Sequence, residues 1–229
     1  LHTVCIGAEP HSEEQRKRIE QLLGVKAYNC FGMSEMNGPG VAFECTEQNG
    51  LHIWEDNVIV EIVDPVTLQP VPEGEVGELV LTTINREAMP LLRYRTRDLT
   101  CILPGDCPCG RTHKRLARFK GRSDDMIILK GVNLFPIQIE KILMQFKELG
   151  SNYLITLETI GNSDEMLIEV ELSDLFTDDY SALQRLTKGI TRQLKDELLL
   201  TPRIKLVAKG SLPTTDGKAV RVKDHRKLC

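Results

Sequence analysis

The sequence predicts an α/β part followed by an α+β part: the end of a doubly wound domain with a β-rich subdomain, and then a small mobile lobe. Three observations lead to this prediction. Residues 1–30 alternate strand, helix and strand; residues 51–118 hold short strands between turn residues; residues 123–229 hold two helical patterns and a hairpin. Such alternation is typical of a doubly wound sheet, and helices beside a short antiparallel sheet are typical of α+β domains. We therefore place the domains at residues 1–122 and 123–229.

The first thirty residues predict the strand–helix–strand unit. The apolar run Val4-Cys5-Ile6 predicts a buried strand, and Gly7-Ala8-Glu9-Pro10 its exit loop. Ser12 is a suitable N-cap, and Glu13 and Glu14 suit the first turn, for a helix running to about Leu23. A second strand is expected over residues 25–30, leading into a turn over residues 31–35.

Short strands with turn residues between them are expected from about residue 51 to 118. Val58–Val63 ends at an Asp-Pro pair, and two glycine-containing turns precede the strand Glu78–Thr82. This spacing predicts a small barrel or sheet subdomain.

Beyond Arg122 the pattern indicates an independent lobe of about a hundred residues. A helix is expected after Pro136, where Ile139, Ile142, Leu143 and Phe146 follow helical spacing. The other expected elements are a strand over residues 126–129, a hairpin over 153–159 and 166–172, a helix over 182–200 and a strand over 204–207.

Bulk composition excludes several classes of protein. A net charge of −4 argues against a nucleic-acid binder, which would carry a basic excess. We expect no membrane partner, because no apolar run approaches the roughly 20 residues that span a bilayer and no signal peptide is present. The seven cysteines are odd in number and unevenly placed, which favours reduced cytoplasmic thiols or metal ligands over a disulfide framework.

The segment Phe31-Gly32-Met33-Ser34-Glu35 and the residues before it could bind a nucleotide. The small residues that follow the first strand would let backbone groups approach a purine, and Tyr28 and Phe31 offer aromatic faces for stacking. Ser34 could contact a phosphate, and the Glu35 carboxylate could hold Mg²⁺, which prefers oxygen ligands. The alternative is a strand-end turn with an ordinary exposed glutamate.

Two further segments carry charges suited to ATP chemistry. Asp98 follows three arginines in the run Arg93–Asp98, where it could accept both ribose hydroxyls or simply form a structural ion pair. Lys218 lies in a glycine-containing loop. A mobile ammonium there could stabilise the negative charge that develops at an α-phosphate, whereas a surface lysine is most often only solvated.

Taken in order, these segments resemble the phenylacetate-CoA ligases of the adenylate-forming superfamily. The resemblance covers essentially the whole chain and includes Gly7–Pro10, Phe31–Glu35, Trp54–Asp56, Glu87–Pro90, Arg93–Asp98, Gly121–Asp125, Gly131–Pro136 and Gly217–Val222. It implies two steps: ATP and an arylacetate give an acyl-adenylate and pyrophosphate, and CoA then gives the thioester and AMP.

The resemblance also implies roles for individual residues. Lys218 would be catalytic, Glu35 would hold Mg²⁺, and Asp124 would be the hinge about which the small lobe rotates between the steps. The turn Lys130, Gly131 and Val132 would line the CoA entry. The residues expected to bind the nucleotide (ATP and then AMP) are Gly7, Ala8, Glu9, Pro10, Tyr28, Phe31, Gly32, Met33, Ser34, Asp98 and Arg122.

The sequence departs from the superfamily pattern at two points. Phe31 stands where a tyrosine is usual, and the glycine-rich phosphate loop does not occur in these residues. We therefore interpret the chain as a C-terminal piece of a longer ligase that is inactive by itself. The implied partners are ATP, CoA and an aromatic carboxylic acid, with a possible homodimer. The alternatives are an adenylate-forming ligase for another acid and a zinc-stabilised interaction module without catalysis.

A possible metal site begins at Cys107-Pro108-Cys109-Gly110, which resembles one half of a zinc knuckle. A structural zinc needs four ligands, and Cys45 with His52 could supply the other pair. Cys101 and His113 are the substitute ligands, and the alternative is a set of thiols without metal. Such a zinc would hold the β-rich subdomain together rather than do chemistry.

Overall fold

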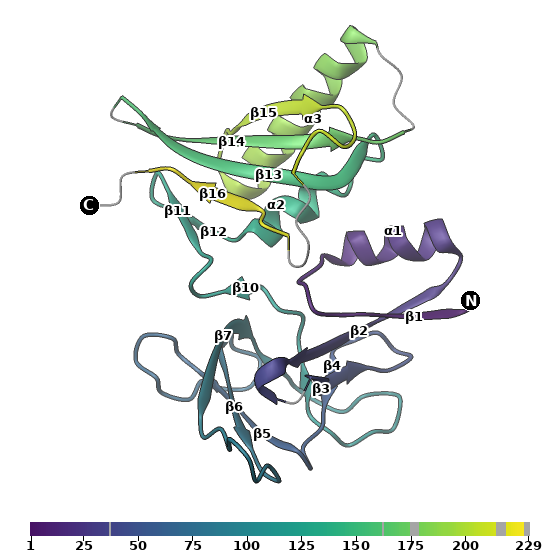
Figure 1. Ribbon diagram of the computed structural model, residues 1–229, viewed down its shortest axis with the longest axis vertical. Coiled ribbons are helices and arrows are strands. Elements are labelled where there is room, and N and C mark those ends of the chain that lie inside the picture. Colours follow the sequence, from purple (N-terminus) through teal and green to yellow (C-terminus); the bar gives the residue numbers. More distant parts are fainter. Residues whose placement is uncertain (37, 162, 175–178, 214–218, 227–229) are drawn as a thin grey trace. The chain divides into compact units, whose positions relative to one another are not determined.

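The computed structural model describes all residues except 37, 162, 175–178, 214–218 and 227–229. The described chain forms two compact units (Figure 1). Unit 1 comprises Leu1–Pro10 and Arg16–Asp125, and unit 2 comprises His11–Gln15 and Met126–Cys229. The mixture of α/β and α+β architecture that the sequence predicts is confirmed.

Unit 1 opens with the expected strand–helix–strand arrangement. Strands β1 (Thr3–Ile6) and β2 (Lys26–Met33) pair in parallel, and helix α1 (Glu13–Leu23) connects them. The prediction of a turn over residues 31–35 is wrong for the first three of these residues, because they belong to β2. Strand β3 (Gly38–Glu44) pairs with this part of β2 through a bulge, so backbone hydrogen bonds keep it extended. The turn itself is the 3₁₀ helix η1 (Ser34–Met36).

Two sheets make up the rest of unit 1. The first continues through β4 (Leu51–Ile53), β9 (Arg115–Leu116) and β8 (Ile102–Leu103), giving the order β1-β2-β3-β4-β9-β8. The second has the order β10-β7-β6-β5, formed by Gly121–Arg122, Tyr94–Thr100, Gly77–Thr83 and Val58–Val63. The β-rich region therefore begins at Gly38 rather than near residue 51, and its strands are shared between two sheets. Its core is formed by buried apolar side chains from both sheets, including Val41, Leu51, Ile53, Leu79, Leu81 and Leu116.

Unit 2 is a four-stranded sheet with two helices. The sheet order is β15-β14-β13-β16, and its strands are Arg203–Val207, Ser163–Leu172, Leu149–Ile160 and Val222–Asp224. Helices α2 (Pro136–Leu143) and α3 (Tyr180–Leu198) contact each other and share an apolar core with the sheet (Figure 1). A short hairpin, β11 (Ile127–Leu129) and β12 (Val132–Leu134), precedes α2.

The expected elements of this lobe are present, whereas β16, which pairs in parallel with β13, was not expected from the sequence. Among the described helices of the chain, none combines the length and apolar character that a membrane crossing requires.

Candidate functional site

A polar corner forms in unit 1 where β7 meets η1 and β10. The Tyr94 hydroxyl lies 3.4 Å from Glu35 Oε1, and Arg86 donates a hydrogen bond to the Glu35 backbone carbonyl. Asp98 lies opposite Arg122 in the β7–β10 pairing, with 4.0 Å between Asp98 Oδ1 and Arg122 Nη1. The Tyr94 hydroxyl interacts electrostatically with Glu35, Asp98 and Arg122. These three residues, which were predicted from separate segments, therefore lie close together.

Arg122 is held in place by several acceptors. Its guanidinium donates to both Asp124 oxygens, at 2.9 and 2.8 Å, and to the Thr96 carbonyl at 3.2 Å. The bidentate bond lowers the pKa of Asp124, whereas burial raises the pKa of Asp125. Arg122 therefore presents a fixed positive charge beside Asp98, in a geometry that suits a polyhydroxyl or anionic ligand.

Tyr94 is a member of this corner that the sequence did not single out as a site residue. Its ring packs against the apolar core of unit 1 while its hydroxyl reaches Glu35. Burial, followed by the charge of Glu35, raises the pKa of Tyr94, so the phenol stays protonated as a donor. Its position in the run Arg93–Asp98 was the only signal, and that run gave no reason to choose a tyrosine over its charged neighbours.

The other predicted nucleotide residues lie at the carboxyl ends of the two parallel strands. Gly7, Ala8, Glu9 and Pro10 follow β1, and Phe31, Gly32 and Met33 end β2, while Tyr28 lies half-buried in the middle of β2. Ligands of doubly wound sheets bind at this edge. Ser34 follows β2 directly and is exposed.

Two of these residues have structural partners of their own. A Cβ on Gly7 would lie 2.4 Å from Cys30 Sγ, so close packing between β1 and β2 already requires glycine there. The Phe31 ring lies 4.4 Å from that of Phe119 in a tilted arrangement, which leaves it half-buried in the unit 1 core.

Strained backbone occurs at three of the predicted segments. Among the described residues, eight non-glycine residues have positive φ, and they include Ala8 (69°), Arg97 (69°) and Lys130 (50°). A non-glycine residue in this region costs of order 1–3 kcal/mol, and such residues concentrate at ligand sites. Arg97 immediately precedes Asp98, and it lies where the register between β6 and β7 shifts.

Unit 2 carries the predicted CoA residues in its β11–β12 turn. Lys130 and Gly131 both have positive φ, as a two-residue type I′ turn requires, and Val132 begins β12. The Lys130 ammonium lies 3.1 Å from Glu165 Oε1, so one carboxylate already partners it. The predicted catalytic Lys218 lies outside the described residues, and the predicted hinge residue Asp124 is next to the last residue of unit 1.

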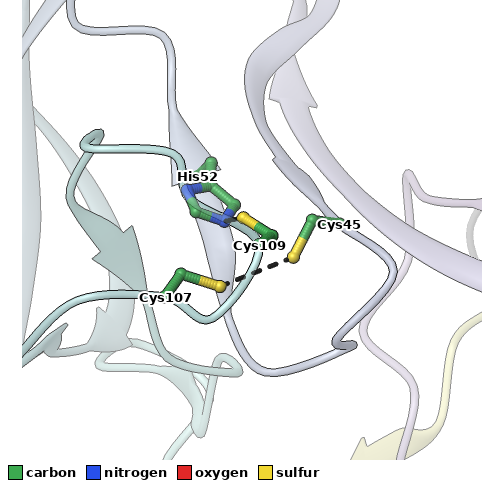
Figure 2. Close-up of side chains that lie close together, drawn as sticks. All are labelled: Cys45, His52, Cys107 and Cys109. Atoms are coloured by element: carbon green, nitrogen blue, oxygen red, sulfur yellow. Dashed lines mark hydrogen bonds between the residues drawn. The ribbon is translucent and has the colours of Figure 1, made fainter.

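A second cluster in unit 1 brings together the four predicted metal ligands (Figure 2). Cys45 follows β3, His52 lies in β4, and Cys107 and Cys109 lie in the loop between β8 and β9. Their ligand atoms all lie within 4.8 Å of one another. The substitute ligands are not in this group: Cys101 is buried elsewhere, and His113 is exposed.

Protonation in the cluster follows from its surroundings. Burial raises the pKa of Cys45 and lowers the pKa of His52. The backbone N–H of Arg111, helped by its side chain, lowers the pKa of Cys109 to about 7. The imidazole is therefore neutral, and Cys109 is the thiol that ionises most easily.

Comparison with known proteins places both units in one family. Residues 1–85 match the family described as AMP-binding enzyme, and residues 131–226 match the AMP-binding enzyme C-terminal domain. Phenylacetate-coenzyme A ligases from Thermus thermophilus and Pseudomonas putida are 43% and 44% identical to it over 99% of the chain.

A solved 2-hydroxyisobutyryl-CoA ligase, bound to an acyl-adenylate, has a TM-score of 0.87 and 30% identity over 96% of this chain and 48% of its own. The chain spans about half the length of the curated relatives it matches (54% and 51%). By these matches, the chain belongs to the AMP-binding enzymes, within the phenylacetate-coenzyme A ligase family.

Proposed function

We propose that the full-length protein is an AMP-forming acid–thiol ligase with phenylacetate as its first candidate substrate. ATP and the acid would give an acyl-adenylate and pyrophosphate, and the CoA thiol would then displace AMP. The observation that carries this proposal is the corner of Glu35, Tyr94, Asp98 and Arg122 in a chain 40–44% identical to curated phenylacetate-coenzyme A ligases.

In the first step the corner would hold the nucleotide. The Asp98 carboxylate would accept hydrogen bonds from the ribose hydroxyls, with Arg122 beside it donating to the same sugar. Glu35 would hold Mg²⁺ through an exposed carboxylate, and the Tyr94 hydroxyl would fix the orientation of that carboxylate. When bound, the metal would neutralise phosphate charge.

Unit 2 would contribute one set of residues to each step. Lys218 is assigned to the adenylation chemistry by its sequence context, and the turn Lys130–Val132 to CoA. Asp124 suits a hinge because it lies near the change from unit 1 to unit 2, at Asp125–Met126. To bind a CoA phosphate, the Lys130 ammonium would have to leave the Glu165 carboxylate, which lies 3.1 Å from it.

The decisive experiment measures AMP release by the full-length protein with ATP, CoA and a panel of acids. Phenylacetate-dependent AMP and phenylacetyl-CoA would support the whole proposal. AMP formed only with benzoate, anthranilate or a short hydroxy acid would retain the ligase and replace the substrate. If no acid in the panel supported AMP release, the non-catalytic module would become the better description.

The alternative of another acid has a specific observation in its favour, because the solved relative with a TM-score of 0.87 is named for 2-hydroxyisobutyrate. The panel of acids distinguishes phenylacetate from such another acid as the substrate. We also propose a cytoplasmic location, on the basis of the cysteine usage, and a homodimer, which size-exclusion chromatography with light scattering would test.

A further inference from the structure

We propose that Cys45, His52, Cys107 and Cys109 bind one Zn²⁺ ion, which fastens the loop between β8 and β9 to the end of β3 and to β4. This cluster is separate from the residues proposed to bind ATP. None of the steps proposed for the ligase reaction uses it.

The spacing of the ligand atoms suits tetrahedral zinc. With Zn–S of about 2.3 Å and Zn–N of about 2.0–2.1 Å, tetrahedral angles place two sulfurs about 3.8 Å apart and a sulfur and a nitrogen about 3.6 Å apart. The distance from Cys45 Sγ to Cys107 Sγ is 3.7 Å, and that from Cys109 Sγ to His52 Nε2 is 3.4 Å. A disulfide would need about 2.05 Å between sulfurs, so these two thiols are free, at a separation that suits two ligands of one ion.

In each ligand pair the first cysteine opens a tight turn. The Gln48 N–H donates to the Cys45 carbonyl at 3.0 Å, and the Gly110 N–H donates to the Cys107 carbonyl at 3.0 Å. Three of the four ligands are buried and the fourth, Cys109, is half-buried. The site is thus closed to solvent on most sides, as structural zinc sites are.

Glycine at position 50 lets the two turns approach each other. Gly50 has a φ of +88°, and a Cβ there would lie 2.5 Å from Leu103 Cδ1 and 3.0 Å from the Leu116 carbonyl oxygen. The segment between Cys45 and His52 therefore packs directly on β8 and β9, which is what brings the ligand pairs within reach.

Two arginines complete the surroundings of the cluster. The Arg115 guanidinium donates to the Asn49 carbonyl of one turn and to the Gly105 carbonyl of the other, each at 3.0 Å. Arg111 hydrogen-bonds to Cys109. Three thiolates and Zn²⁺ carry a net charge of −1, and a neighbouring guanidinium offsets that charge.

The ligand types favour zinc over other ions. Soft thiolates with one imidazole select zinc over magnesium or calcium, and a Cys₃His set is one of the usual structural combinations. Four protein ligands leave no open position for substrate, so the ion would stabilise the fold. The loop it fastens leads through β9 to Phe119, whose ring contacts Phe31, and then to β10 with Arg122.

The test is metal analysis of the full-length protein purified under reducing conditions without chelator. About one zinc per chain is expected in wild type, and its loss in Cys107→Ser and His52→Asn. Cys101→Ser and His113→Asn are matched controls, because they remove a buried thiol and an imidazole outside the cluster. Both controls should keep the metal.

Should a ligand variant fail to fold, two measurements on wild type keep the proposal falsifiable. Replacing zinc by Co²⁺ should give the absorption bands of a tetrahedral thiolate site, and a chelator should expose three additional thiols to a thiol reagent. Wild type that stays metal-free after incubation with Zn²⁺, metal retained by Cys107→Ser, or an iron–sulfur chromophore would each overturn the proposal.

Discussion

Replacing Asp98 by Asn tests the nucleotide corner most directly. The Asp98→Asn change keeps the size of the side chain, and Arg122 should keep its place because Asp124 holds it through two bonds of 2.9 and 2.8 Å. The change therefore removes a charged acceptor without removing the arginine beside it. Losing one hydrogen bond to a charged group costs about 1.5–3 kcal/mol. At about 1.4 kcal/mol per factor of ten, kcat/KM for ATP should fall roughly 10- to 100-fold.

The assay is AMP release at varied ATP, run on the full-length protein with its best acid. A matched control is Asp196→Asn, an exposed aspartate on α3 with one arginine partner at 3.7 Å. If Asp98 accepts ribose hydroxyls, wild type should discriminate against 2′-deoxy-ATP, and the Asp98→Asn variant should discriminate much less. Unchanged kcat/KM for ATP, or the same discrimination in both proteins, would refute the ribose assignment.

Three other changes test the chemistry and the fold. Lys218→Ala should lower acid-dependent adenylation by on the order of 10²–10³ while ATP binding persists, as seen by isothermal titration. Glu78→Gln should lower the free energy of unfolding of unit 1 by about 3 kcal/mol, the low end of the range for breaking a buried ion pair. The low end applies because the side chain of its partner Arg95 is 30% exposed. Arg95 lowers the pKa of Glu78, so the stability from this pair is present above the unfolded pKa and lost as pH falls through the folded one; urea unfolding at several pH values measures it. Gly50→Ala should lower the unfolding temperature, because the new Cβ would meet Leu103 at 2.5 Å in a strained conformation.

Local patterns in the sequence were sufficient for most elements. The N-cap Ser12 and an acidic first turn predicted α1, and a helical period predicted α2, because the signals for both helices are local in the sequence. Strand β16 has only three residues, too few to show a period, and it forms because Val222 finds Ile155 of β13 as its partner. The same reason explains Phe31–Met33, which we expected in a turn: they are part of a strand because they pair with β3.

The sequence predicted the charged residues of the nucleotide corner but not the contacts between them. Glu35 and Asp98 were candidates because a carboxylate can hold Mg²⁺ or accept ribose hydroxyls, and the family resemblance was needed to favour Asp98 over an ion pair and to add Arg122. Tyr94 was not a candidate, because its role depends on a hydroxyl reaching across to η1, a contact that only the packing of β7 creates.

The four-ligand cluster shows how a local signal and a tertiary one combine. The spacing of Cys107 and Cys109 indicates one pair of ligands, and Cys45 and His52, on either side of Gly50, were the preferred partners over Cys101 and His113. Only the fold brings the two pairs together. The choice is made by the antiparallel pairing of β4 with β9, in which His52 lies opposite Arg115. That register turns one imidazole toward the Cys107–Cys109 loop and leaves the other, at position 113, in solvent. A shift of one residue in the pairing would turn His52 to the opposite face of the sheet and dismantle the set. Zinc bound at this point would therefore select a single register for two very short strands, a selection that two backbone pairs alone specify weakly.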